Sequence, residues 1–145
     1  MNIAIQKYLP HRQPMQMVDT ITQISETDIK TLFFVAEDCI FVENNHLCES
    51  GLIENMAQTC SAVVGQFYFT DSDPNKRIIG YISAIKSLHI NQLPEVLQTI
   101  RTDAEQISRY DAEGYSLCGM QCNAYHNDTL LASAEMNLFI KELSI

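Results

Sequence analysis

Apolar positions along the chain follow strand-like spacing at first, then helical spacing, then strand-like spacing again. Residues 15–24 and 28–37 predict two strands, because each contains apolar and β-favouring residues and the SETD between them has the composition of a turn. From Leu52 to Phe67, apolar side chains recur at helical spacing over a broad face, and several residues between them are small. This segment predicts a helix that is buried on most sides, with Ser50 or Gly51 as its cap.

The rest of the chain predicts four consecutive strands. They span residues 78–90, 95–108, 114–125 and 129–141, with turn-like segments at 91–94, 109–113 and 126–128, and the linker DSDPNKR (71–77) precedes them. Long strands joined by hairpins indicate an antiparallel sheet, and the helix must pack against one face of it. The prediction is an α+β fold, a single domain over residues 1–145 in which a curved sheet wraps a long central helix.

Composition narrows the possible partners. The net charge of −9 argues against nucleic acid or an anionic membrane surface as the main partner. No apolar run approaches the length of a membrane span, and the N-terminus lacks the features of a signal peptide. The five cysteines are odd in number and lack C-x-x-C spacing, which agrees with a cytoplasmic protein. Cys118 and Cys122 face one side of a predicted strand, where a metal pair and two buried free thiols both stay open.

Several motifs carry a resemblance to a known family. LPHRQPMQMVDTI, residues 9–21, resembles the opening of FabZ-type β-hydroxyacyl-acyl-carrier-protein dehydratases, where a Leu-Pro-His-Arg-x-Pro stretch leads into a strand ending Val-Asp. ENMAQ, residues 54–58, resembles the Glu-Ala-Met-Ala-Gln at the start of that family's central helix. IIGYISAIKSLHI (78–90) and AYHNDTLLASAEM (124–136) resemble the strand after the helix and the last hairpin. The resemblance covers nearly the whole chain in the right order.

The resemblance implies the hotdog fold and a dimer. In this fold the sheets of two subunits join edge to edge, and the active sites lie at the interface between them. A homodimer is implied, with a heterodimer that includes a related hotdog subunit as the alternative. Pairing of subunits would also protect the long edge strands that the predicted sheet exposes.

The family's chemistry assigns roles to three residues on the helix. Dehydration of a 3-hydroxyacyl thioester needs a base for the α-proton, an acid for the departing hydroxyl and a donor for the thioester oxygen. The resemblance makes Glu54 the proton-handling carboxylate on the first helical turn; the alternative is a carboxylate that only interacts with the helix dipole. Gly51 corresponds to the glycine whose N–H region polarises the carbonyl, or it merely lets the chain turn into the helix. Gln58 is placed to hydrogen-bond Glu54 or a buried backbone group.

The family's second proton-transfer residue is a histidine before the helix. Here the matching region, IFVENNHLCESG, is shorter and has no proline. Anchored from the helix, His46 takes that position; anchored from the aromatic side, Asn44 takes it, and an asparagine cannot act as a base. His46 is therefore either the base or a surface histidine of a polar loop. His11 is expected to hold the N-terminal segment, while His89 and His126 have no assigned role.

Three functions follow as hypotheses. The first is a 3-hydroxyacyl-acyl-carrier-protein dehydratase of fatty-acid or specialised, polyene-type lipid synthesis. The second is a non-catalytic hotdog subunit that binds an acyl chain or a catalytic partner, and the third is a hotdog acyl thioesterase. None of these requires a cofactor, and the sequence has no nucleotide or metal motif. An acidic carrier protein would need a basic docking patch, for which the candidates are Arg12, Lys76, Arg77 and Lys86.

Overall fold

A computed structural model describes residues 2–66 and 77–143 of the protein. Its elements in chain order are β1 (Ile3–Ala4), the short 3₁₀ helix η1 (Ile5–Lys7), β2 (Thr20–Ile24), β3 (Asp28–Phe34), β4 (Val42–Glu43), β5 (His46–Leu47), α1 (Glu49–Gly65), β6 (Arg77–Ile90), β7 (Thr99–Ala112), β8 (Tyr115–His126) and β9 (Thr129–Leu143). The predicted order of two strands, a helix and four strands is confirmed, and short strands are added to it near the N-terminus and before the helix.

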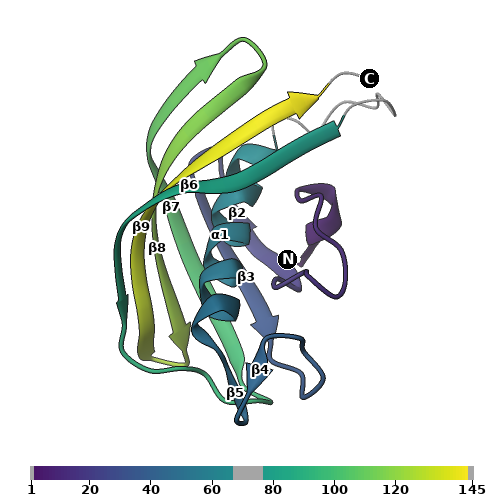
Figure 1. Cartoon of the computed structure of the whole chain (residues 1–145), viewed down its shortest axis with the longest axis vertical. Coiled ribbons are helices and arrows are strands. Elements are labelled where there is room, and N and C mark those ends of the chain that lie inside the picture. The colour runs from purple at the N-terminus through teal and green to yellow at the C-terminus, as the bar shows by residue number, and fades with distance from the viewer. Residues whose placement is uncertain (1, 67–76, 144–145) are drawn as a thin grey trace.

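One antiparallel sheet of seven strands forms the body of the molecule, in the order β1-β2-β3-β7-β8-β9-β6. The sheet curves around α1, which lies in its concave face and contacts five of its strands (Figure 1). Strand β6 follows the helix in sequence but pairs with β9, at the far edge from β2 and β3. This is the predicted α+β arrangement of a central helix wrapped by a curved sheet.

The helix is buried on nearly all sides, as its sequence predicts. Every residue from Asn55 to Gly65 is buried. Leu52, Met56, Cys60 and Val63 are fully inaccessible and pack with sheet residues into one core. An apolar helix of this kind is stabilised by the surrounding sheet and would be unstable alone in water.

The segment before β2 departs from the predicted strand. Residues 15–19 are not part of the sheet, and β2 begins only at Thr20. The Met17 N–H donates to Gln58 Oε1 (2.7 Å), and the Met17 carbonyl accepts from Asn55 Nδ2 (2.7 Å). Helix side chains therefore satisfy the backbone groups that a neighbouring strand would otherwise have bonded.

Two hairpins also differ from the prediction. Residues 109–112, predicted as a turn, continue β7, and the turn is shorter, at Glu113 and Gly114. Gly114 has a φ of +83°, which suits glycine in a tight turn. The polar loop before the helix contains the β4–β5 hairpin, whose turn residues Asn44 and Asn45 have φ values of +53° and +65°. Asparagine tolerates this left-handed conformation better than most residues. Most of the predicted linker at 71–77 lies outside the described residues.

The start of α1 corrects two predictions. Cys48 is the N-cap, without a side-chain cap, so neither Ser50 nor Gly51 caps the helix. The acidic residue of the first turn is Glu49, and Glu54 lies one turn further along. Because the dipole effect falls off within the first turn, a purely dipolar role for Glu54 becomes weaker.

Candidate active site

Glu54 faces a small cavity of about 140 Å³ between the N-terminal segment, the helix and the end of the sheet near β6. The helix contributes Glu54, Ala57, Gln58 and Ser61, which are spaced at i, i+3, i+4 and i+7 and so share one helical face. The other walls are His11, Gly80, Tyr81, Ile82 and Leu138. Glu54 is half-buried, so its carboxylate has partial access to solvent beside a mostly buried surface.

Gln58 ties the carboxylate to the N-terminal segment. Its Nε2 donates to the Met15 carbonyl (2.9 Å) and to Glu54 Oε2 (3.3 Å), while its Oε1 accepts from the Met17 N–H (2.7 Å). Both sequence-based expectations for Gln58 are therefore met at once. Buried Asn55 adds a second link, since its Oδ1 accepts from Thr102 Oγ1 (2.7 Å) while its Nδ2 bonds Met17. This amide network fixes the motif that contains His11 against the face that carries Glu54.

His11 belongs to this cavity, although the sequence suggests only a structural role for it. Its ring makes no hydrogen bond in the described part of the chain, and its Nδ1 is buried without a partner. Arg12 holds the segment instead: its Nη1 donates to the carbonyls of Leu9 (2.8 Å) and His11 (2.8 Å). Burial lowers the pKa of His11, the Glu54 carboxylate opposes that shift, and the Arg12 cation adds to it.

His46 lies elsewhere in the chain. It begins β5 and lines an open hollow of about 500 Å³ together with Asn44 and three carboxylates, Glu43, Glu49 and Glu95. Its Nδ1 donates to the Asn44 carbonyl (2.8 Å), and its Nε2 lies 3.8 Å from Glu95 Oε1. Within one chain, neither His46 nor Asn44 shares the cavity of Glu54. Whether His46 or Asn44 of one subunit faces Glu54 of the other across a dimer interface stays a prediction.

Gly51 is buried where the β4–β5 hairpin crosses the helix. A Cβ at this position would lie 2.6 Å from Phe41 Cβ and 2.7 Å from Leu47 Cδ1, so only glycine permits this close packing. Leu52 is the first residue of the helix whose N–H reaches the cap, at Cys48 O (3.0 Å). The Gly51 N–H precedes it and belongs to the donors that a helix start leaves without an intrahelical acceptor. Gly51 lines neither hollow, and its role in polarising a carbonyl stays a prediction.

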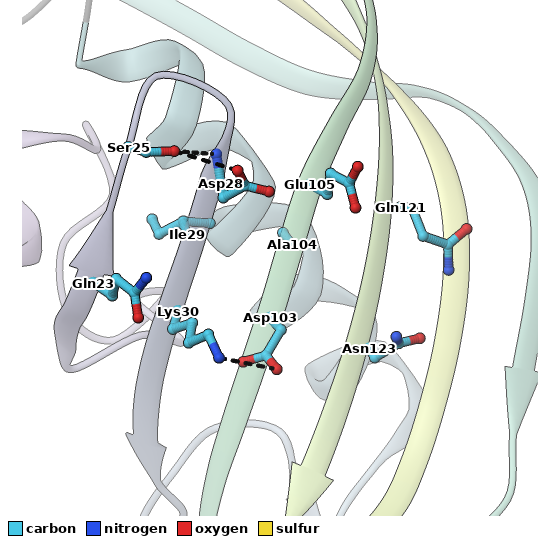
Figure 2. Close-up of a pocket in the computed structure, with 10 residues that line it drawn as sticks. All are labelled: Gln23, Ser25, Asp28, Ile29, Lys30, Asp103, Ala104, Glu105, Gln121 and Asn123. Carbon is cyan, nitrogen blue, oxygen red and sulfur yellow. Dashed lines mark hydrogen bonds and ion pairs between the residues drawn. The ribbon is translucent and has the colours of Figure 1, made fainter.

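Two further hollows have carboxylates but no histidine among their lining residues. One, of about 430 Å³, is largely apolar and includes Met17, Phe33 and Ile40. The other, of about 370 Å³, lies on the face of the sheet away from the helix (Figure 2). Its side chains come from β2, β3, β7, β8 and the turn after β2, and they are mostly polar, with Lys30 Nζ 4.0 Å from Asp103 Oδ2. The first hollow is also lined by Cys39 and by Asp19, whose pKa is raised by burial, so it differs from the cavity of Glu54 in having no histidine.

Three of the five cysteines are part of the core. All five are free thiols, and Cys60, Cys118 and Cys122 are buried. A hydrogen bond with Cys122 and burial raise the pKa of Cys60, and burial raises the pKa of Cys118 to about 11. Among residues 2–66 and 77–143, no cluster of three or more His, Cys, Asp or Glu could hold a metal ion. Cys118 and Cys122 are both buried, which fits the interpretation as buried free thiols.

Two of the four candidate docking residues make contacts within the chain. Arg12 bonds its own segment, and Lys86 Nζ lies 3.9 Å from Glu135 Oε2 on the neighbouring strand. Lys76 and the side chain of Arg77 lie outside the described part of the structure. No helix in the described part of the chain is long and apolar enough to cross a membrane.

Ser61 and Tyr81 are polar residues of the cavity to which the sequence assigns no role. Ser61 follows Glu54 at i+7 on the same face of the helix. Ser61 and Ala57 are both small, which leaves space for a cavity beside this face. Tyr81 is 53% exposed and packs on Phe139, with ring centroids 5.1 Å apart. The place of His11 in this cavity is not visible in the local sequence pattern, because its neighbours there all lie far away in the chain.

The fold defines the class of protein. Its architecture matches that of the dehydratase heterocomplex ApeI:P from Xenorhabdus doucetiae with a TM-score of 0.79 at 16% sequence identity, over 94% of this chain and 90% of that one. A hypothetical thioesterase from Streptococcus pneumoniae, solved with coenzyme A, matches with a TM-score of 0.59 at 9% identity, over 86% and 87%. The chain is thus a hotdog-fold protein, as predicted.

The family follows from the sequence itself. The family model of the ApeP-like proteins, described as ApeP dehydratase, matches residues 3–144, and the chain belongs to this family. This places it among the hydro-lyases and agrees with the FabZ-type resemblance of its motifs. A search among curated protein sequences finds no match.

Proposed function

We propose that the protein eliminates water from a 3-hydroxyacyl thioester carried by an acyl carrier protein, in fatty-acid or polyene-type lipid synthesis. The observation that carries this proposal is the placement of Glu54. Its carboxylate faces a small cavity, held there by Gln58, within a dehydratase family. A carboxylate in such a cavity can exchange a proton with, or hydrogen-bond, the hydroxyl of a bound substrate. A donor near Gly51 at the helix start would stabilise the thioester oxygen.

A dimer would support this function, and we propose that one forms along β6. This strand has 14 residues and, within the described sheet, pairs with β9 alone. Its Ile79, Tyr81 and Ile85 are large and exposed. A long apolar edge of this kind pairs readily with another strand. Because the Xenorhabdus dehydratase is a heterocomplex, a related hotdog subunit is a partner to be tested beside a second copy.

Other features of the chain support a cellular setting for this function. The five unpaired cysteines support a reducing compartment, for which the cytoplasm is proposed. One core cluster joins the helix and the sheet, which supports a single domain over residues 1–145. The chemistry itself requires no cofactor.

The test is a product assay with the purified protein. It is incubated with a 3-hydroxyacyl carrier-protein thioester, and the 2-enoyl thioester and the free acid are measured by mass spectrometry. Enoyl product that Glu54→Gln abolishes supports the dehydratase. Free acid without enoyl product would instead favour the thioesterase, and neither product would rule out both enzymatic functions for this chain alone.

A non-catalytic subunit is the second candidate, and one observation favours it. In this chain His46 contacts Glu95 at the hairpin, in a hollow lined by three carboxylates. A histidine engaged in this way is not poised beside Glu54 in its own chain. This candidate predicts that the protein copurifies with a second hotdog subunit when the two are produced together, and that Glu54→Gln leaves the activity of that complex unchanged.

A further inference from the structure

The ring of His11, which lies beside the cavity of Glu54, carries a buried polar atom without a partner in the described part of the chain. Its Nδ1 is one of only two buried side-chain polar atoms without a hydrogen-bond partner among the described residues. Buried polar atoms are bonded in the great majority of cases, so an exception requires an explanation. The side chain of His11 lines a cavity that Glu54 also lines.

The charges around His11 favour a neutral ring that can accept a proton. Burial is the main cause of its lowered pKa, and the nearby Arg12 cation acts in the same direction. Glu54 from the helix acts against them, so it would stabilise a proton that arrives on the ring. Tyr81 of β6 is the other ionisable side chain on the wall of the cavity. A neutral imidazole offers a lone pair on one nitrogen, and that nitrogen can take a proton from carbon.

We propose that His11, and not His46, is the base that works with Glu54 in the dehydration, so that the acid–base pair lies within one chain. This inference rests on the proposed function. The Cα–H bond of the substrate breaks and its proton moves to the free nitrogen of His11. The electron pair forms the Cα=Cβ bond, and the Cβ–O bond breaks as the hydroxyl departs. The hydroxyl takes the proton from the imidazolium and leaves as water, which returns His11 to its neutral form.

Glu54 has a different part in this scheme from the one that the family resemblance implies. Its carboxylate accepts a hydrogen bond from the substrate hydroxyl and stabilises the transient imidazolium through its charge. Gln58 holds the carboxylate in place by donating to Oε2 (3.3 Å). The same Gln58 binds the backbone at Met15 and Met17, so one side chain sets the positions of both partners.

The size of the cavity limits what it can hold. About 140 Å³ suffices for the reacting end of a substrate but not for a whole acyl chain, since ligand pockets usually measure about 300–1,000 Å³. One wall is formed by Gly80, Tyr81 and Ile82 of the edge strand β6. A second subunit that pairs along β6 would therefore extend the cavity and complete the site for the acyl chain.

The experiment compares the same substitution at the two histidines. His11→Asn keeps a polar atom near the position of Nδ1 but removes the basic nitrogen, and His46→Asn is the matched control. The substrate is the 3-hydroxybutyryl thioester of pantetheine, and the enoyl product is followed in the protein with its natural partner subunit where one is required. We expect His11→Asn to lower kcat by at least about 100-fold with little change in KM, and His46→Asn to leave kcat within about threefold.

Several outcomes would overturn the inference. If the wild-type protein is active, His11→Asn keeps its rate and His46→Asn loses it, the inference is wrong while the proposed function stands. If the wild-type protein forms no enoyl product, both fail. If His11→Asn does not fold, the wild-type protein provides the test. The decrease of its kcat/KM at acidic pH must then follow the same titration as the NMR signal of the His11 ring. A decrease that does not follow that signal also contradicts the inference.

Discussion

Two histidines of the first half of the chain, His11 and His46, occupy contrasting surroundings. His11 stands on a segment that the buried amides Gln58 and Asn55 hold from inside, beside a small cavity and one carboxylate. His46 stands in a two-residue strand of a hairpin, 41% exposed, above a broad hollow with three carboxylates. Position along the chain favours His46, because it closely precedes the helix. The folded structure favours His11, since a proton-transfer group needs a defined position more than a short distance in sequence.

The acidic hollow of His46 also suits the proposed substrate poorly. An acyl carrier protein is acidic, and like charges across an interface slow association and lower affinity. Glu43, Glu49 and Glu95 would repel it at that hollow. The cavity of Glu54 has the positively charged Arg12 beside its His11 wall, and residues of the edge strand β6 form another wall. The comparison therefore predicts that substrate arrives from the side of the N-terminal segment and β6.

The largest effect should come from the carboxylate of Glu54, and the carboxylate of Glu95 in the other hollow serves as its control. Glu54→Gln keeps the shape and a hydrogen-bonding partner for Gln58 but removes the charge, so enoyl formation should fall by about 10²–10⁴-fold. Glu95→Gln, the same change in the other hollow, should leave the rate within about threefold. Both rates are measured with the carrier-protein thioester at saturating concentration. A Glu95→Gln variant that loses as much activity as Glu54→Gln would remove the distinction between the hollows.

The next effect tests the amide network that distinguishes the two regions. Gln58→Leu leaves the Met17 N–H and the Met15 carbonyl without their partners. The Met17 N–H is buried, and leaving it unsatisfied costs about 1–3 kcal/mol, so the free energy of unfolding should fall by about that amount. Urea unfolding measures it, with exposed Gln23→Leu as the control. A loss no greater than that of the control would mean that the network does not hold the His11 segment.

The sequence predicts the helix and sheet well but the site only in part. The helix and the four long strands can be predicted from the spacing of apolar residues. Both face the same core, so apolar residues recur at helical spacing in the helix and at alternate positions in the strands. Local pattern cannot assign Met15 to Val18, since the partners of Met17 are Asn55 and Gln58 on a distant helix. Glu54 is accessible to sequence reasoning because the ENMAQ motif includes the side chain that orients it. His11 is not, because its neighbours in the cavity are all far away in the chain.

The β4–β5 hairpin escapes prediction for a related reason. Its strands have two residues each, too few for alternation to be visible, and the turn pair Asn44-Asn45 is the only local signal. Interpreting that pair as a turn would place His46 on an exposed hairpin. The packing of this hairpin on the helix is equally hidden, because it depends on the missing Cβ of Gly51.

A smaller effect tests where that hairpin packs. Gly51→Ala introduces a Cβ within 2.6 Å of Phe41 Cβ. Alanine favours a helix over glycine by about 0.5–1 kcal/mol, whereas overpacking costs about 1–3 kcal/mol, so we expect a net loss of about 1–2 kcal/mol. Ser50→Ala, one residue earlier and exposed, is the control for helix propensity in thermal unfolding. A Gly51→Ala variant more stable than wild type would show that the hairpin moves away without cost.

The smallest effect is the pH dependence that His11 gives to folding. Burial holds its pKa below the ordinary 6.5, so in the interval between the two values the unfolded chain binds more protons than the folded one. Stability must therefore rise with pH through this interval and fall on acidification. Because His11 is only partly buried, the change should stay below about 1 kcal/mol.

Two variants isolate this contribution. His11→Asn should flatten the dependence of the unfolding free energy on pH below 6.5. Glu54→Gln should steepen it, because loss of the carboxylate removes the one charge that raises the pKa of His11. Urea unfolding at closely spaced pH values measures both slopes against wild type. If Glu54→Gln leaves the slope unchanged, Glu54 and His11 do not interact in solution, and the cavity then contains two independent groups and not a pair.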